Sequence, residues 1–213
     1  MKKVGMLALT VVLVMMGLSA NAQTRFGVLG GFTSSNSSVK EFTAKSVSLY
    51  HAGVAVNIPI GSILAIQPQV LYQMKGTSLD NVGSENVKLE TKNGYLEVPV
   101  QVQAGVILDN FRVYGFAEPF VGVALTNNTE ATNYDASNIS WDNLNMKRWE
   151  YGLGFGAGVQ FWRLQLSAKY FWNFGSLCKE EGSTTGTIAD QVGTAFKDGK
   201  NFDGIAFTLG IFF

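Results

Sequence analysis

The fold of this chain is best predicted from residues 95–106, which read Tyr-Leu-Glu-Val-Pro-Val-Gln-Val-Gln-Ala-Gly-Val. The even positions of this stretch are apolar, and Glu97, Gln101 and Gln103 lie between them. Alternation with a period of two predicts a β-strand with one apolar and one polar face. A soluble protein turns the polar face to water, whereas a membrane barrel turns the apolar face to lipid and the polar face to its lumen. The alternation alone leaves both arrangements open.

The same alternation recurs along the whole chain and predicts eight strands. Their approximate bounds are 25–33, 47–58, 63–74, 94–107, 111–125, 148–161, 163–173 and 202–213. The connections at 59–62, at 108–110 and around Trp162 are tight turns. Those at 34–46, 75–93, 126–147 and 174–201 are long and rich in Ser, Asn, Thr, Asp and Gly, which favour turns and loops.

The alternation of short and long connections separates the two arrangements. Every second connection is long, so in an up-and-down barrel all long loops emerge at one end and both termini lie at the other. Short periplasmic turns, long outer loops and an even strand number are typical of outer-membrane barrels. A soluble up-and-down barrel such as a lipocalin would turn its apolar residues inward. We therefore expect an all-β fold, an eight-stranded antiparallel up-and-down transmembrane β-barrel.

The start of the chain predicts export. Lys2 and Lys3 precede an apolar run from Val4 to Leu18, and Ala20-Asn21-Ala22 follows as a small-residue cleavage site. This is the pattern of a secretory signal peptide. We expect residues 1–22 to be the signal peptide and residues 23–213 to form the barrel domain.

Charge and composition exclude several classes of function. The chain has 16 basic and 16 acidic residues, and without Lys2 and Lys3 the net charge is near −2, with no basic cluster of the kind that binds nucleic acid. Cys178 is the one cysteine and His51 the one histidine in the sequence. A lone thiol and a lone imidazole do not make a disulfide or a typical metal site. We expect no cofactor.

The inward parity carries most of the charge. An eight-stranded barrel has an interior just wide enough to be filled by side chains, and charges buried there must be paired and hydrogen-bonded. Counting from the turns places Lys169 opposite Gly156, and Glu118 beside Gln101. We expect a polar network in the lumen that comprises Glu97, Gln101, Arg112, Glu118, Glu150, Arg163 and Lys169, with Arg25 and Arg148 on the same parity.

Glycines occupy the inward face of the predicted strand 148–161. They are Gly152, Gly154, Gly156 and Gly158. One interpretation is that this glycine strip makes room for Lys169 and Glu118 to approach each other. The other is that the glycines relieve curvature in a small barrel. The sequence leaves both open.

Four stretches resemble the PorT-like outer-membrane β-barrel family of Bacteroidetes, a group of small barrels similar to OmpA and OmpX. They are residues 23–32, the Tyr-Leu-Glu-Val-Pro element within 94–100, residues 114–122, and the closing strand 207–213 with its final Phe. The resemblance implies residence in the outer membrane of a Gram-negative bacterium and insertion by the barrel-assembly machinery.

The function we expect is that of a non-enzymatic surface interaction or structural protein. It would lie in outer-membrane lipid with its long loops extracellular, able to contact a host or cell-surface ligand, and both termini periplasmic. One alternative is a small-solute conduit or an accessory of a secretion apparatus. Another alternative is a lipid-modifying enzyme, but the sequence shows no nucleophile at a spacing that would pair it with His51.

Overall fold

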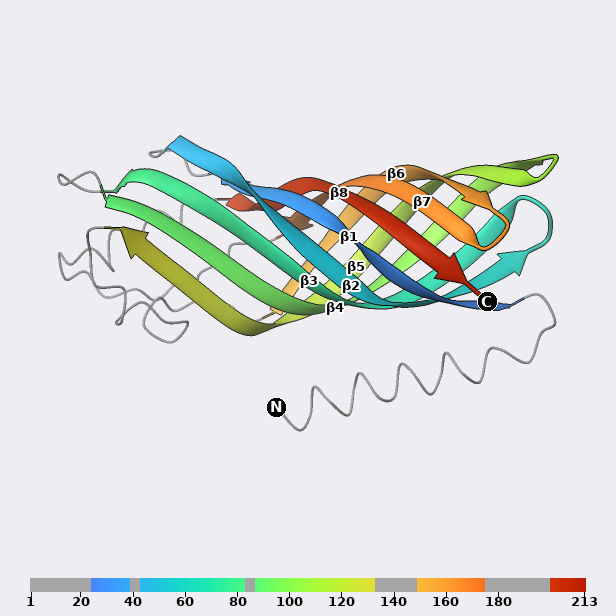
Figure 1. The fold of residues 1–213 in the computed structure, drawn as a ribbon, viewed down its shortest axis with the longest axis horizontal. Coiled ribbons are helices and arrows are strands. Elements are labelled where there is room, and N and C mark those ends of the chain that lie inside the picture. Colours follow the sequence, from blue (N-terminus) through green and yellow to red (C-terminus); the bar gives the residue numbers. More distant parts are fainter. Residues whose placement is uncertain (1–23, 39–42, 83–86, 133–148, 175–199) are drawn as a thin grey trace.

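The computed structural model describes residues 24–38, 43–82, 87–132, 149–174 and 200–213. Within these ranges, eight antiparallel strands each pair with their neighbours in sequence, and the last pairs with the first to close a barrel (Figure 1). The strands are β1 Arg25–Ser38, β2 Thr43–Ile60, β3 Leu64–Val82, β4 Val87–Leu108, β5 Phe111–Thr132, β6 Trp149–Phe161, β7 Leu164–Phe174 and β8 Lys200–Phe212. This confirms the predicted up-and-down barrel. The predicted signal peptide, residues 1–22, lies outside the described residues.

Apolar side chains cover the outside of the barrel and polar side chains fill the inside. On β4, Val102 is 49% exposed, whereas its neighbours Gln101 and Gln103 are buried. On β6, exposed Tyr151, Phe155 and Val159 alternate with inward positions. This arrangement is the reverse of a soluble protein and matches a barrel whose outer wall faces lipid. Within the described part of the chain, no helix has the length and apolarity to cross a membrane.

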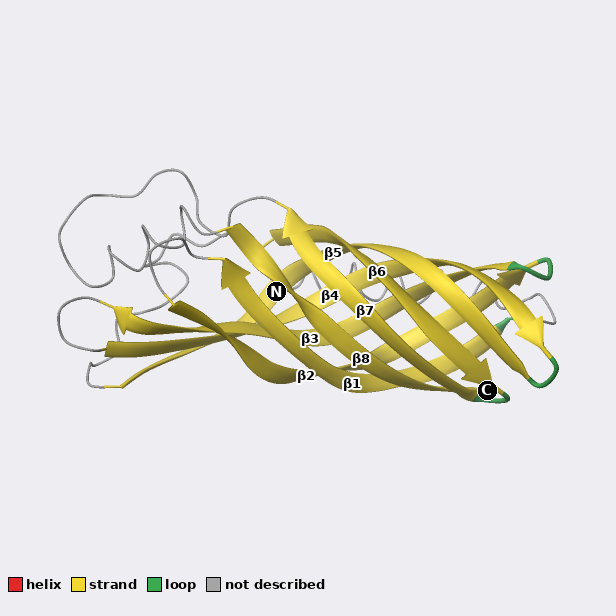
Figure 2. Cartoon of the chain, turned by 90° about the horizontal axis from the view of Figure 1, so that it is seen from above, coloured by secondary structure: helices red, strands yellow, loops and turns green. Residues whose placement is uncertain are grey.

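The register follows from the tight turns, which lie together at one end of the barrel (Figure 2). Gly61 in the β2–β3 turn has a φ of 67°, and Asp109 and Trp162, which open the next two turns, have φ values of 53° and 51°. Counting away from the β6–β7 turn, Lys169 pairs with Gly156, as the sequence predicted. On the other side of β6, Gly154 pairs with Glu118 of β5.

Four consecutive strands are much longer than a membrane requires. A transmembrane strand needs about 9–11 residues, but β2, β3, β4 and β5 have 18, 19, 22 and 22. They extend past the other strands at the end opposite the tight turns, toward the left of Figure 1. We call this part, formed by residues 43–49, 75–82, 87–94 and 124–132, the extended sheet.

The extended sheet corrects the predicted loops. Much of 34–46 and 75–93, and the beginning of 126–147, were expected to be loops because they are rich in Ser, Asn, Thr, Asp and Gly. The structure instead continues the ladder, for example from Thr77 to Thr91 between β3 and β4. Backbone hydrogen bonds of a ladder do not depend on the polarity of side chains, so the strands can continue through a stretch rich in polar residues.

Candidate functional site

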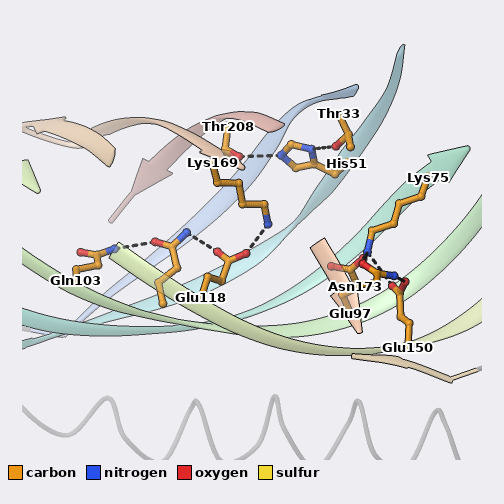
Figure 3. A network of polar contacts seen from close by, with 11 residues as sticks. Thr33, His51, Lys75, Glu97, Gln103, Glu118, Glu150, Lys169, Asn173 and Thr208 are labelled. Carbon is orange, nitrogen blue, oxygen red and sulfur yellow. Dashed lines mark hydrogen bonds and ion pairs between the residues drawn. The ribbon is translucent and has the colours of Figure 1, made fainter. Parts of the chain in front are cut away.

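The lumen holds two groups of polar side chains, and within each group the side chains are connected by hydrogen bonds and ion pairs (Figure 3). We call the group Lys75, Glu97, Glu150 and Asn173 the loop-side cluster, because it lies farther from the tight turns. We call the series Lys169, Glu118, Gln101, Gln103 and Arg112 the mid-barrel chain. Each group draws on several strands, so alternation along single strands brings these residues together only after the barrel has closed.

Lys75 is the centre of the loop-side cluster. Its Nζ lies 2.8 Å from Glu97 Oε1 and 3.1 Å from Glu150 Oε1, and donates to Asn173 Oδ1 at 3.3 Å. Asn173 Nδ2 in turn donates to Glu150 Oε2 at 2.5 Å. The Lys75 side chain is 0% exposed. Two carboxylates therefore share one ammonium group in a site without contact to solvent.

Aromatic rings enclose the same ammonium group. Lys75 Nζ lies 4.4 Å from the ring centroid of Phe120, 5.0 Å from that of Phe171 and 5.5 Å from that of Tyr95. A cation within about 6 Å of a ring centroid is attracted by the ring quadrupole, and the attraction is larger where water is absent. The rings thus add to the stabilisation of the cation and close the lumen around it.

The mid-barrel chain begins at Lys169 of β7 and ends at Arg112, which is at the tight-turn end of β5. Lys169 Nζ forms an ion pair with Glu118 Oε1, and Gln101 Nε2 donates to Glu118 Oε2 at 2.6 Å. Gln103 Nε2 donates to Gln101 Oε1 at 2.9 Å, and Arg112 donates to Gln103 Oε1 at 2.8 Å. Lys169 and Glu118 come from strands separated by β6, as the sequence predicted.

Amide side chains form a further hydrogen-bonded group in the lumen, on the tight-turn side of this series. Asn57 Nδ2 donates to Gln67 Oε1 at 2.9 Å, and Gln103 Nε2 donates to the same oxygen at 3.0 Å. Gln67 is 1% and Gln103 0% exposed. We call these three residues the amide layer. These residues come from the neighbouring strands β2, β3 and β4 and lie near their tight-turn ends.

His51 lies in the lumen between two hydroxyl groups. Its Nδ1 is 2.9 Å from Thr33 Oγ1 and its Nε2 is 2.9 Å from Thr208 Oγ1. Gly31 leaves space for the ring, because a Cβ there would lie 2.7 Å from His51 Cε1. His51 is 2% exposed. A general base must reach its substrate, so this buried ring fits a role in packing and not in catalysis.

Most residues of the expected network lie within these groups. Glu97 and Glu150 are in the loop-side cluster; Gln101, Arg112, Glu118 and Lys169 are in the mid-barrel chain. Arg163 is a correction: it lies in the β6–β7 turn, exposed, with its guanidinium 5.0 Å from the ring of Trp162. The inward parity of this strand begins only at Gln165, because β7 starts at Leu164.

Two further arginines were expected on the inward parity. Arg25 is exposed at the rim, where its Nη1 donates to the carbonyl of Trp162 at 3.3 Å. Arg148 lies outside the described residues. The sequence reasoning missed Lys75, which it assigned to a loop. Its position two residues after Gln73 continues the inward parity of β3, and that signal could have found it.

The glycine strip of β6 makes room for rings of β5 and for the close approach of the β7 backbone: a Cβ on Gly156 would lie 2.2 Å from the carbonyl oxygen of Ala168, and one on Gly152 2.3 Å from that of Trp172. A Cβ on Gly156 would lie 2.5 Å from Phe116 Cζ, one on Gly158 2.5 Å from Tyr114 Cζ, and one on Gly152 2.8 Å from Phe120 Cε1. At Gly154 the nearest side-chain atom is Glu118 Cβ, at 3.7 Å. The spacer interpretation thus needs a correction: aromatic side chains, which the sequence reasoning did not place in the lumen, occupy most of the space.

The chemistry of the lumen is that of a sealed polar core. Lys75, Glu97, Gln103 and Glu118 are each at most 1% exposed and contact partners from other strands. Among the described residues, no group of three or more His, Cys, Asp or Glu side chains is placed to hold a metal ion. The arrangement can hold the barrel in one conformation and can block the bore.

Comparison with known proteins gives the family. Residues 19–179 match the family described as "Outer membrane protein beta-barrel domain". No curated protein sequence matches the chain. Among solved structures, Neisserial surface protein A is similar at 13% identity, with 88% of this chain and 97% of that chain covered and a TM-score of 0.42.

Two other solved structures are similar over a comparable length. Ail, the attachment invasion locus protein of Yersinia pestis, has 11% identity, coverage of 89% and 98%, and a TM-score of 0.41. OprG from Pseudomonas aeruginosa has 14% identity, coverage of 89% and 95%, and a TM-score of 0.48. The family match covers well over half of the sequence, so this chain belongs to the outer membrane protein β-barrel domain family and is a protein of the outer membrane.

Proposed function

We propose that the protein is a non-enzymatic surface barrel, closed to solutes, that acts as an interaction or structural protein of the outer membrane. The observation that carries this proposal is the packed lumen. The loop-side cluster and the mid-barrel chain both lie in the lumen (Figure 3), the amide layer shares Gln103 with the mid-barrel chain, and the central residues of all three are buried. An eight-stranded barrel has no spare interior once such side chains fill it.

The extended sheet supports the part of the proposal that concerns the surface. It lies at the end where the long connections emerge, opposite the tight turns (Figure 2). Outer-membrane barrels have short periplasmic turns and long outer loops. We therefore place the extended sheet and the long loops outside the cell and both ends of the mature chain, residues 23–213, in the periplasm. Insertion by the barrel-assembly machinery and a PorT-like origin in Bacteroidetes are part of the same proposal.

The extended sheet offers backbone groups as well as side chains to a partner. The β4–β5 ladder continues to Lys88 and Thr132, whereas the β5–β6 ladder ends at the pair Val123 and Trp149. Among the described residues, the outer part of β5 is therefore paired on one side only. We propose that the extended sheet is the surface that a partner contacts. A host or cell-surface protein is the kind of ligand that fits it.

Conductance separates this proposal from a small-solute conduit. The purified mature protein, inserted into planar bilayers, should show no steady ion conductance, because the lumen is packed. A control variant, Phe120→Ala with Lys75→Ala, removes a ring and the cation it faces, and should raise conductance if it folds. Steady single-channel conductance of the wild type would refute the closed barrel.

Protease mapping and pull-down test the surface role. Trypsin added to intact cells should cleave in the long connections and leave the tight turns intact. Cleavage at Arg163 from outside would reverse the proposed orientation. Capture of a host or cell-surface protein by the wild type, lost when Ala131 in the outer part of β5 is replaced by Pro, would support the interaction role of the extended sheet. Capture of components of a secretion apparatus, unaffected by that change, would favour the accessory role instead.

A further inference from the structure

A cavity of about 750 Å³ lies at the tight-turn end of the barrel. Its walls come from the beginning of β1, from all three tight turns and from the end of β8. Figure 2 shows these turns gathered at one end, with the C-terminus beside them. The amide layer lies immediately inside, since Asn57 belongs both to that layer and to the cavity wall. Gln67, Gln103 and Glu118, farther inside, are each at most 1% exposed, so the cavity is a blind cup and not the entrance to a channel.

Three arginines line this cup: Arg25 from β1, Arg112 from β5 and Arg163 from the β6–β7 turn. We call them the basic mouth. Asp109 is the one acidic side chain among the lining residues. The cup therefore has a positive potential at neutral pH.

The guanidinium groups of the basic mouth have no carboxylate partner among the described residues. Arg25 donates to the carbonyl of Trp162 at 3.3 Å, and Arg163 stacks over the Trp162 ring at 5.0 Å. Arg112 donates to Gln103 Oε1 at 2.8 Å and to the carbonyl of Ile63 at 3.2 Å. All these acceptors are neutral. Elsewhere in the lumen, by contrast, Lys75 and Lys169 each contact a carboxylate.

We propose that the basic mouth is a binding site for a phosphate group carried on an organic body. Guanidinium groups bind phosphate through paired, charge-assisted hydrogen bonds. Arginines that approach from three parts of a ring suit a tetrahedral anion, whose oxygens point in several directions, better than a planar carboxylate. The amides of Asn57 and Gln160 line the same cup and can donate further hydrogen bonds.

The rest of the wall indicates what the phosphate is attached to. Leu64, Ile107, Phe111 and Phe212 line the cup beside the arginines. A volume of about 750 Å³ is within the range of small-molecule pockets, and far larger than a bare phosphate needs. The ligand class is therefore a phosphate ester with an apolar part. Two sources have this chemistry: a soluble phosphomonoester, and the headgroup of a phospholipid in the adjoining leaflet. The proposed orientation of the barrel in the membrane determines only the compartment in which the ligand is found. The chemistry of the site does not depend on it.

Isothermal titration of the refolded full mature chain in neutral maltoside micelles tests the site. The first probe is phenyl phosphate, with phenol as its uncharged counterpart. The second is short-chain dihexanoyl phosphatidylglycerol mixed into the micelles, with dihexanoylglycerol as its counterpart. Phenyl phosphate binding identifies a soluble ester as a ligand. Binding of the phosphatidylglycerol alone identifies a lipid headgroup.

Arg163→Gln is the informative variant, because Arg163 is exposed in a turn and its loss leaves the barrel core intact. It should weaken binding by about tenfold, the effect of one charge-assisted hydrogen bond. Lys92→Gln removes one positive charge at the other end of the barrel and should leave binding unchanged. Heat-modifiable gel mobility checks that each variant is folded. Absence of binding by both phosphate probes, or equal affinity of wild type and Arg163→Gln, would overturn the proposal.

Discussion

Replacement of Lys75 by Met tests whether the lumen is held together by buried charge pairing. Met has nearly the length of Lys but no charge, so the change removes the cation and keeps most of the volume. Lys75 Nζ lies 2.8 Å from Glu97 and 3.1 Å from Glu150, and is 0% exposed. The variant would leave two carboxylates buried next to each other without a counter-charge.

The magnitude follows from this geometry. Removal of one partner from a buried ion pair costs about 3–5 kcal/mol, because the remaining charge is uncompensated. Two carboxylates lose their partner here, and the attraction to the rings of Phe120 and Phe171 is lost as well. We expect the free energy of unfolding to fall by at least about 3 kcal/mol, more than a hundredfold in the folding equilibrium.

The assay is urea unfolding in phospholipid vesicles, followed by heat-modifiable gel mobility and by tryptophan fluorescence. Lys92→Met is the control, since Lys92 is partly exposed and the loss of an exposed charge with its contacts should cost about 1 kcal/mol or less. The triple variant Lys75→Met, Glu97→Gln, Glu150→Gln should recover most of the stability, because no charge is left uncompensated. Unchanged stability of the single variant, or a triple variant less stable than the single one, would refute the reasoning.

Three further predictions concern the wall and the mid-barrel chain. Gly156→Leu should destabilise the barrel by at least about 1–3 kcal/mol, because the added side chain overpacks against the β5 rings. Gly115→Ala should not, because its Cβ would meet no atom closer than 3.8 Å. Heat-modifiable gel mobility that changes at the same temperature in both variants would contradict this. Lys169→Met should lower the free energy of unfolding in urea by about 3–5 kcal/mol, and the double change Lys169→Met, Glu118→Leu should lower it by less than the single change. Losses of stability that add up in the double variant would count against a buried pair. Val102→Lys should cost about 2–4 kcal/mol in vesicles if this position faces the lipid interior, and a neutral effect would argue against that placement.

The fold was predictable because its signal is local and repeated. Val102 and Gln103 are neighbours with opposite environments, 49% and 0% exposed, and the same contrast recurs on every strand with described side chains on both faces. The register was predictable where it depends only on a tight turn. Lys169 meets Gly156 because few residues separate each of them from the β6–β7 turn.

The extent of the strands and the full content of the lumen were not predictable in the same way. Lys75 lies beyond the apolar part of β3, where the outward residues no longer mark a lipid face, so the alternation that identifies a membrane strand fades. Phe116 and Phe120 face inward against glycines of the next strand, a complementarity that depends on cross-strand register. Arg163 was expected in the lumen because the sequence does not show that the turn takes in both Trp162 and Arg163, so that β7 begins only at Leu164.

Two neighbouring residues of β6 distinguish a wall that faces lipid from a polar interior. Val159 is exposed on the outer wall, and Gln160 lines the cavity at the mouth. In a Cys178→Ser background, Val159→Cys and Gln160→Cys are each labelled with bimane and reconstituted into vesicles. The account predicts that brominated phospholipids quench the label at 159 and aqueous iodide quenches the label at 160. The opposite pattern, or quenching of both labels by iodide alone, would contradict an apolar wall that faces lipid around a polar interior.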